Sequence, residues 1–301
     1  MAIVVQTNVA SLIAQNNLTT STARMDQAME RMTTGYKINS AKDDAAGLYV
    51  ATSLDKNIRG SEVAQKNVQM GNDVIAVAEG DLSGIQDNLL RIRDLALTAA
   101  NGIYDQDSLN AIKAEVTARL DEIDRTASVS DYNGKKLLDG TIDSITLQVG
   151  ANTSTNDIID ITGVFGDARA SALGITSRGT TPTYTIEETF KLPAGPADAD
   201  YDPDAPSLTT KLHDFVNQVD SALKEVQDRR TEIGAVQNRL DSAAQSLTTT
   251  IENLTSSKST IMDADIAAES TEYINSQILQ QAAASLLVQA NQAPQIALSL
   301  I

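Results

Sequence analysis

The fold is set by residues 212–261, which read LHDFVNQVDSALKEVQDRRTEIGAVQNRLDSAAQSLTTTIENLTSSKSTI. Apolar side chains recur at every seventh position of this stretch, and a second apolar row follows three or four positions behind the first. Such a repeat predicts one long helix whose narrow apolar face packs against another helix in a left-handed coiled coil. The residues expected to form this heptad seam are Leu212, Val219, Val226, Ile233, Leu240, Leu247, Leu254 and Ile261.

A second seven-residue repeat lies upstream, in residues 54–99, and supplies the expected partner helix. Its members are aliphatic or alanine except Ser61, and the helix should end near Asn101-Gly102, because both residues tolerate the left-handed backbone of a helix C-terminus. A shorter helix is expected from about Asp107 to Ala127, since its apolar residues fall on one side. We therefore predict a mainly α-helical fold, a long antiparallel coiled-coil bundle.

The periodicity changes to two between these helices. Ile145, Leu147 and Val149 alternate with polar residues, and a second apolar run follows in residues 157–161 after a turn that contains glycine. This pattern predicts a small β-hairpin. Residues 178–206 hold most of the prolines of the chain together with spaced aspartates, so we expect a short, surface-exposed insert there.

Both ends of the chain lack acidic and basic side chains, from Met1 to Ala23 and from Tyr273 to Ile301. Each end reads as a helix with one apolar stripe and one neutral polar face. A single helix of this kind is marginal in water, because its apolar stripe has nothing to pack against. We expect the two terminal helices to pair with each other and with copies of themselves, through Leu12, Ile13, Leu18, Ile278, Leu279, Leu286, Leu287 and Leu300.

Signals for a helix end and a helix start near the N-terminus indicate the domain organisation. Gly35 should end the first helix, and Ser40 with Asp43 three residues later has the form of a capping box for the next helix. The expected domains are a terminal coiled coil of residues 1–43 and 262–301, a helical rod with the hairpin formed by residues 44–177 and 207–261, and the insert at 178–206.

Composition and charge exclude several functional classes. The formal net charge of −17 argues against nucleic-acid binding, which requires basic residues. The chain has no cysteine and a single histidine, His213, and it lacks a phosphate-binding glycine loop. The spaced aspartates of residues 198–204 lack the glycine and the closing glutamate of a calcium loop. We therefore expect no enzymatic activity, no metal and no cofactor.

The neutral ends also bear on membranes and export. The C-terminal tract contains many Gln, Asn and Ser residues and is interrupted by Pro294, so we expect no membrane span. The N-terminus lacks the basic start and the long apolar core of a secretory signal. If the protein acts outside the cell, we expect export without a cleavable signal peptide.

Several motifs resemble those of bacterial flagellin. The stretch INSAKDDAAGL at residues 38–48 is similar to a signature of that family. Further similar segments are residues 82–101, RLDEIDR at 119–125, QVGAN at 148–152, GAVQNR at 234–239, QILQQA at 277–282 and QANQAPQ at 289–295. The resemblance covers nearly the whole chain apart from residues 178–206, so the chain resembles a short flagellin with a minimal central variable region.

This resemblance implies a structural protein that is secreted and self-assembles, as a helical polymer of itself, into the filament of the bacterial flagellum for swimming motility. The implied partners are an export chaperone, the filament cap and the hook–filament junction proteins. In the family, the vertebrate Toll-like flagellin receptor contacts residues that correspond to Arg91, Leu95 and Glu115. The alternative role is a hook–filament junction (hook-associated) protein, which shares flagellin-like ends.

Overall fold

The computed structural model describes residues 7–175, 186–192 and 207–298. The described chain forms two compact units: the terminal unit, residues 1–59 and 250–301, and the rod unit, residues 60–249. The helices are α1 (Val9–Thr34), α2 (Ala45–Ala99), α3 (Gln106–Val129), α4 (Ile186–Thr189), α5 (Leu208–Met262) and α6 (Ile266–Leu298). The predicted mainly α-helical class is confirmed. Most of the insert expected at 178–206 lies outside the described residues.

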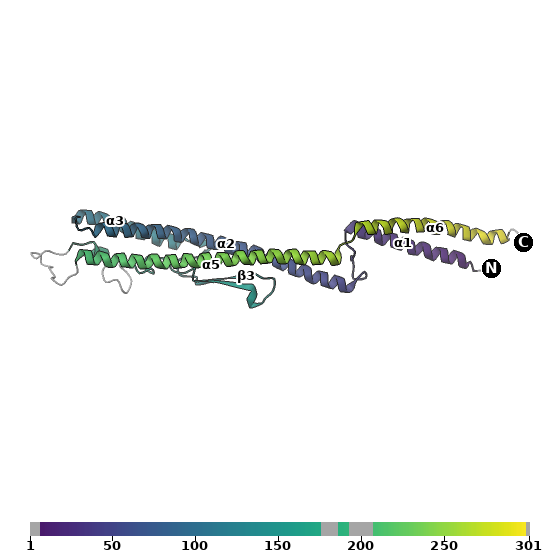
Figure 1. Cartoon of the computed structure of the whole chain (residues 1–301), viewed down its shortest axis with the longest axis horizontal. Coiled ribbons are helices and arrows are strands. Elements are labelled where there is room, and N and C mark those ends of the chain that lie inside the picture. The colour runs from purple at the N-terminus through teal and green to yellow at the C-terminus, as the bar shows by residue number, and fades with distance from the viewer. Residues whose placement is uncertain (1–6, 176–185, 193–206, 299–301) are drawn as a thin grey trace, which may run out of the picture. The chain divides into compact units, whose positions relative to one another are not determined.

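Helices α2, α3 and α5 run alongside one another in the rod unit (Figure 1), and their buried residues form one aliphatic core. Helices α2 and α5 are antiparallel, because Arg93 on α2 bonds Asp220 on α5 at 2.6 Å and Gln65 bonds Thr248 at 3.1 Å. Helix α3 contributes one buried side, which includes Leu109, as the spacing of its apolar residues predicts. The end of α2 is also as predicted, since Gly102 follows it with a φ of 70°.

The predicted hairpin is present on the rod unit, where β3 (Ser144–Gln148) pairs antiparallel with β4 (Ile158–Thr162). Glycines of α2 let this hairpin approach closely. A Cβ on Gly60 would lie 2.8 Å from the Cβ of Ala151, and a Cβ on Gly71 would collide with Leu147. A second, unpredicted hairpin joins β1 (Asp131–Tyr132) to β2 (Lys135–Lys136).

In the terminal unit, α1 ends as predicted, because Gly35 adopts the left-handed conformation and its N–H bonds the carbonyl of Arg31. The two connecting segments then bond each other: Lys37 N–H donates to Met262 O at 2.7 Å, and Ala264 N–H donates to Gly35 O at 2.9 Å.

The capping box predicted at Ser40 is wrong. Ser40 and Asp43 bond each other within the turn that precedes α2. Helix α2 begins at Ala45, and the Asp44 carboxylate accepts the N–H of Gly47 at 2.9 Å. Asp44 therefore satisfies an orphan amide of the first turn, the role that the sequence pattern gave to Ser40.

Candidate assembly surface

Small side chains form the contact between α1 and α6. Ala14, Ser21 and Ala28 recur every seven residues on α1 and are buried, and Ser276 and Ala283 are buried on α6 at the same spacing. Small residues at a helix contact allow the two backbones to approach closely. This small-residue seam pairs the helices and buries none of their large apolar side chains completely.

Polar contacts fix the register of α1 and α6. Arg31 bonds Glu269 at 3.1 Å near one end of the pair, and Gln280 donates to the Thr22 hydroxyl at 3.0 Å farther along. At the other end, the Asn8 side chain donates to the carbonyl of Ala290 at 2.8 Å. Residue numbers rise along α1 as they fall along α6, so the helices are antiparallel, and the predicted pairing of the two ends is confirmed.

Several large apolar residues of the pair are more than half exposed. This outer apolar face comprises the side chains of Leu12, Ile13, Ile278, Leu279 and Leu286, each 52–58% exposed. Leu18 and Leu287 are half-buried, and Leu300 lies outside the described residues. The usual distribution is therefore inverted in part, because the fully buried residues of the pair are small and several of its large ones are exposed.

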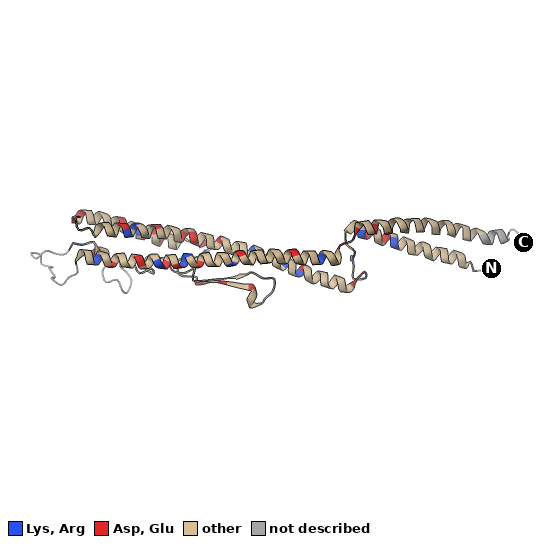
Figure 2. Ribbon diagram, viewed as in Figure 1, with Lys and Arg blue, Asp and Glu red and all other residues tan. Residues whose placement is uncertain are grey.

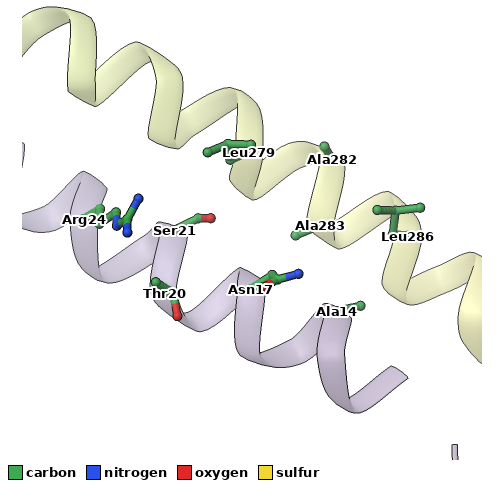
Figure 3. A pocket seen from close by; sticks show the side chains of 9 residues that line it. All are labelled: Ala14, Asn17, Thr20, Ser21, Arg24, Leu279, Ala282, Ala283 and Leu286. Carbon is green, nitrogen blue, oxygen red and sulfur yellow. The ribbon is translucent and has the colours of Figure 1, made fainter. Parts of the chain in front are cut away.

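A hollow of about 390 Å³ opens between α1 and α6. Figure 3 shows Asn17, Ser21 and Arg24 on the α1 side and Leu279 and Leu286 on the α6 side. The hollow lies between exposed leucines of α6 and the polar residues of α1, with the charged Arg24 among them.

Charge is absent from most of this surface. The sequence places the first charged residue of α1 at Arg24 and the last of α6 at Glu272. Figure 2 shows the described remainder of both helices without acidic or basic residues. Copies can pack on this stretch without burying an unpaired charge, which would cost several kcal/mol.

Helix α5 buries the heptad seam unevenly. Leu212, Val219, Val226, Ile233 and Leu240 are fully buried in the core of the rod unit, and Leu247 is nearly so. Leu254 and Ile261, in the part of α5 that belongs to the terminal unit, are only partly buried. The sequence spacing is the same throughout, so the difference comes from what packs against each part of the helix.

The three residues matched to receptor contacts have unequal exposure. The guanidinium of Arg91 bonds the Glu115 carboxylate at 2.9 Å, and both side chains are accessible. This hydrogen bond lowers the pKa of Glu115 and raises the pKa of Arg91. Leu95 is 7% exposed. The structure thus brings Arg91 and Glu115 together at the surface and places Leu95 in the core.

The small-residue seam was missed by sequence reasoning, although the sevenfold spacing of Ala14, Ser21 and Ala28 carried a signal for it. Within the described ranges, no helix has the length and apolar content needed to cross a membrane. The same ranges contain no group of three or more His, Asp or Glu residues arranged for a metal ion.

Comparison with known proteins adds family matches at both ends of the chain. A model described as the bacterial flagellin N-terminal helical region matches residues 5–143, and one described as the bacterial flagellin C-terminal helical region matches residues 216–301. A flagellin of Bacillus subtilis is 37% identical over 311 residues, covering 98% of each chain. Polar flagellin F of Vibrio parahaemolyticus is 32% identical over 376 residues, covering all of both chains.

Among solved structures, a putative flagellar hook-associated protein from Vibrio parahaemolyticus superposes with a TM-score of 0.55 at 16% identity. The match covers 73% of this chain and 99% of that one. At this identity the likeness shows a common fold and nothing about the role.

Proposed function

The chain belongs to the bacterial flagellin family, and from this premise we propose that α1 and α6 drive its polymerisation by burying their outer apolar face against other copies. Members of this family are structural proteins, so the chain is a subunit of the extracellular flagellar filament, serves motility and is not an enzyme. No observation favours the hook-associated alternative, because the hook-associated relative shares the fold alone.

The observation that carries the proposal is the inverted α1–α6 pair. Five large aliphatic side chains remain more than half exposed on the outer apolar face, on a surface free of charge. Full burial of a Leu or Ile is worth about 1.5–3 kcal/mol, so burying the remaining half of five such residues contributes on the order of 5 kcal/mol per subunit. That contribution becomes available only when another copy covers the face.

The pairing of α1 and α6 in a single subunit is only weakly favourable in free energy. Its seam buries alanine and serine, which remove little apolar area from water, while ordering two long helices costs conformational entropy. We infer that the terminal helices are only marginally ordered in the free subunit and become fixed in the polymer. A head-to-tail contact that does not close then extends into a helical filament.

Each of the three predicted domains has its own place in the proposed filament. We propose that residues 1–43 and 262–301 form the inner core of the filament, that residues 44–177 and 207–261 form the surrounding rod, and that the insert 178–206 faces outward. Export in an unfolded state, with an export chaperone, the filament cap and the junction proteins as partners, is proposed on the family resemblance.

Recognition by the vertebrate Toll-like flagellin receptor is a further proposal, supported by the accessible Arg91–Glu115 pair. A reporter-cell assay with purified monomer should respond to the parent and respond less to Arg91→Ala. An equal response to both proteins would show that this pair is not part of the contact.

Truncation tests the main proposal. Deleting residues 273–301 should leave a soluble, folded rod unit that does not polymerise, and filaments from this truncation in negative-stain microscopy would refute the mechanism. A milder variant, Leu279→Gln with Leu286→Gln, should raise the protein concentration needed for salt-induced polymerisation. The matched control is Leu192→Gln, which changes an exposed leucine of the rod unit and should polymerise as the parent does.

A further inference from the structure

The outer side of α2 in the rod unit carries two glycines that nothing within the described chain requires. Gly80 and Gly84 lie one helical turn apart in the helix interior, and a Cβ built on either would meet no atom within 4 Å. Gly60 and Gly71, in the same helix, are different because the β3–β4 hairpin fills the space beside them. Glycine weakens a helix interior relative to alanine. Gly80 and Gly84 therefore weaken α2 without serving its own packing.

The same side of α2 borders a hollow of about 260 Å³ next to the end of α3. Val77 and Val129 line this hollow and are 37% and 58% exposed. Ser130 also lines it, is 4% exposed, and has a buried hydroxyl without a hydrogen-bond partner among the described residues. A buried hydroxyl left unpaired costs free energy, and a group supplied from outside would recover it. This is a second, independent sign that the surface is incomplete in a single chain.

The helices of the rod unit differ in their apolar exposure. Large hydrophobic residues are exposed along α2 and at the end of α3, whereas α5, which is described over its whole length, exposes none. Asp81, Arg125 and Asp131 also line the hollow, so the surface carries charges of both signs beside its glycines and valines.

We propose that the surface defined by Val77, Gly80, Gly84 and Val129, here called the glycine face, binds a second copy of this chain, whose main chain approaches α2 closely over the two glycines. The proposal rests on the polymerisation argued above and adds to it a specific contact on the rod unit. The absent Cβ atoms make room for the neighbour, the valines and the hollow bury apolar side chains, and Ser130 gains a partner.

The first test separates subunit stability from assembly. The double variant Gly80→Ala with Gly84→Ala should melt at a higher temperature as a monomer, because alanine favours the helix and meets no obstacle. Its polymerisation should nevertheless require at least a tenfold higher protein concentration, which corresponds to about 1.4 kcal/mol. Polymerisation at the concentration needed by the parent would overturn the proposal.

Gly234→Ala provides the matched control. Gly234 lies on α5 at the same level of the rod unit, since Arg230 and Gln237 on either side of it bond Gln86 and Glu79 of α2. Its Cβ position is equally open, but no exposed large hydrophobic residue accompanies it on α5. The control should gain heat stability and polymerise normally. If it polymerised as poorly as the double variant, helix flexibility rather than docking would explain both results, and the proposal would fail.

Chemical protection gives a direct readout. The natural chain has no cysteine, so Val77→Cys provides a single reactive thiol. Maleimide should label the monomer readily and the assembled filament at least ten times more slowly, and equal rates would overturn the proposal. Filaments in which this thiol stays unprotected would leave assembly through α1 and α6 intact, whereas a parent chain that forms no filament would instead remove the premise of the proposed function.

Discussion

Replacing Leu240 by alanine should destabilise the protein far more than replacing Leu254, although both residues hold the same position in the heptad repeat. Leu240 is 0% exposed within the core of the rod unit, and Leu254 is only partly buried. Deleting a fully buried leucine side chain leaves a cavity and costs about 3 kcal/mol. A leucine that keeps part of its surface in water loses less, about 1 kcal/mol.

The expected effect can be converted into a melting temperature. For a unit the size of the rod unit, each kcal/mol shifts Tm by about 2–4 °C, so Leu240→Ala should lower the Tm of the rod unit by about 6–12 °C. Leu254 lies in the terminal unit, so Leu254→Ala should leave the rod-unit transition close to that of the parent. Far-UV circular dichroism of the monomer at low salt measures both, with separate transitions read individually because the two units can unfold apart.

The conservative variant Leu240→Met keeps the side-chain volume and should cost less than about 1.5 kcal/mol. Equal losses of Tm for Leu240→Ala and Leu254→Ala would refute the reasoning. Such a result would mean that the last turns of α5 are packed as tightly as its middle.

Three further outcomes are expected. Lys258 donates a hydrogen bond that lowers the pKa of Asp55 below its value in the unfolded chain, so the stabilising contribution of the ionised Asp55 is complete above about pH 4 and is lost as the pH falls through the lower folded pKa. Asp55→Asn should therefore reduce the slope of Tm against pH in this acidic range. An unchanged slope would contradict the assignment. Gly60→Ala should lower Tm despite the better helix propensity of alanine, because its Cβ would lie 2.8 Å from the turn between β3 and β4; hydrogen exchange of β4 should accelerate, and exchange at the parent's rate would count against this packing. Ala283→Leu should separate α1 from α6 at an overpacking cost of about 1–3 kcal/mol and abolish filaments, while Ala284→Leu, at an exposed neighbouring position, should polymerise.

Long helices were predictable here because one periodicity runs through them without interruption. The heptad repeat places Leu240 and Leu254 on one face of α5, and α5 is one continuous helix from Leu208 to Met262. The repeat cannot say how completely each residue is covered, since coverage depends on α3 and the hairpins, which pack beside only part of α5. Periodicity therefore determines the direction of a side chain, and its burial depends on neighbours that are distant in the sequence.

Short local signals were less reliable. The pattern at Ser40 and Asp43 satisfied the rule for a capping box, yet the two residues close a turn and Asp44 caps α2 instead. Both residues offer an oxygen at a helix start, and the path of the preceding chain decides between them. The β1–β2 hairpin was missed because strands of two residues are too short to alternate, although Asn133-Gly134 is a strong turn signal.

The assembly role expected of Leu12 and Leu279 stays a prediction, and the structure shows that both side chains are more than half exposed in the single chain. The expectation did not include the seam of Ala14, Ser21 and Ala283, because an apolar stripe is recognised by its large side chains and alanine and serine are small. The hollow beside Leu279 arises from the spacing of two helices, and no local pattern specifies that spacing.

The two units of the chain thus differ in where their stability comes from. The rod unit buries large aliphatic residues such as Ile75, Leu89 and Ile233 in a core that one chain completes, so its free energy of folding does not depend on concentration. The terminal pair completely buries only alanine and serine and leaves several leucines and isoleucines more than half exposed, which other copies would cover on the proposed mechanism. A subunit built in this way can stay folded in its rod and soluble while it is alone. On the mechanism that we propose, the leucines that contribute little to the monomer contribute most to the filament, because neighbouring subunits supply the apolar surface that the chain lacks.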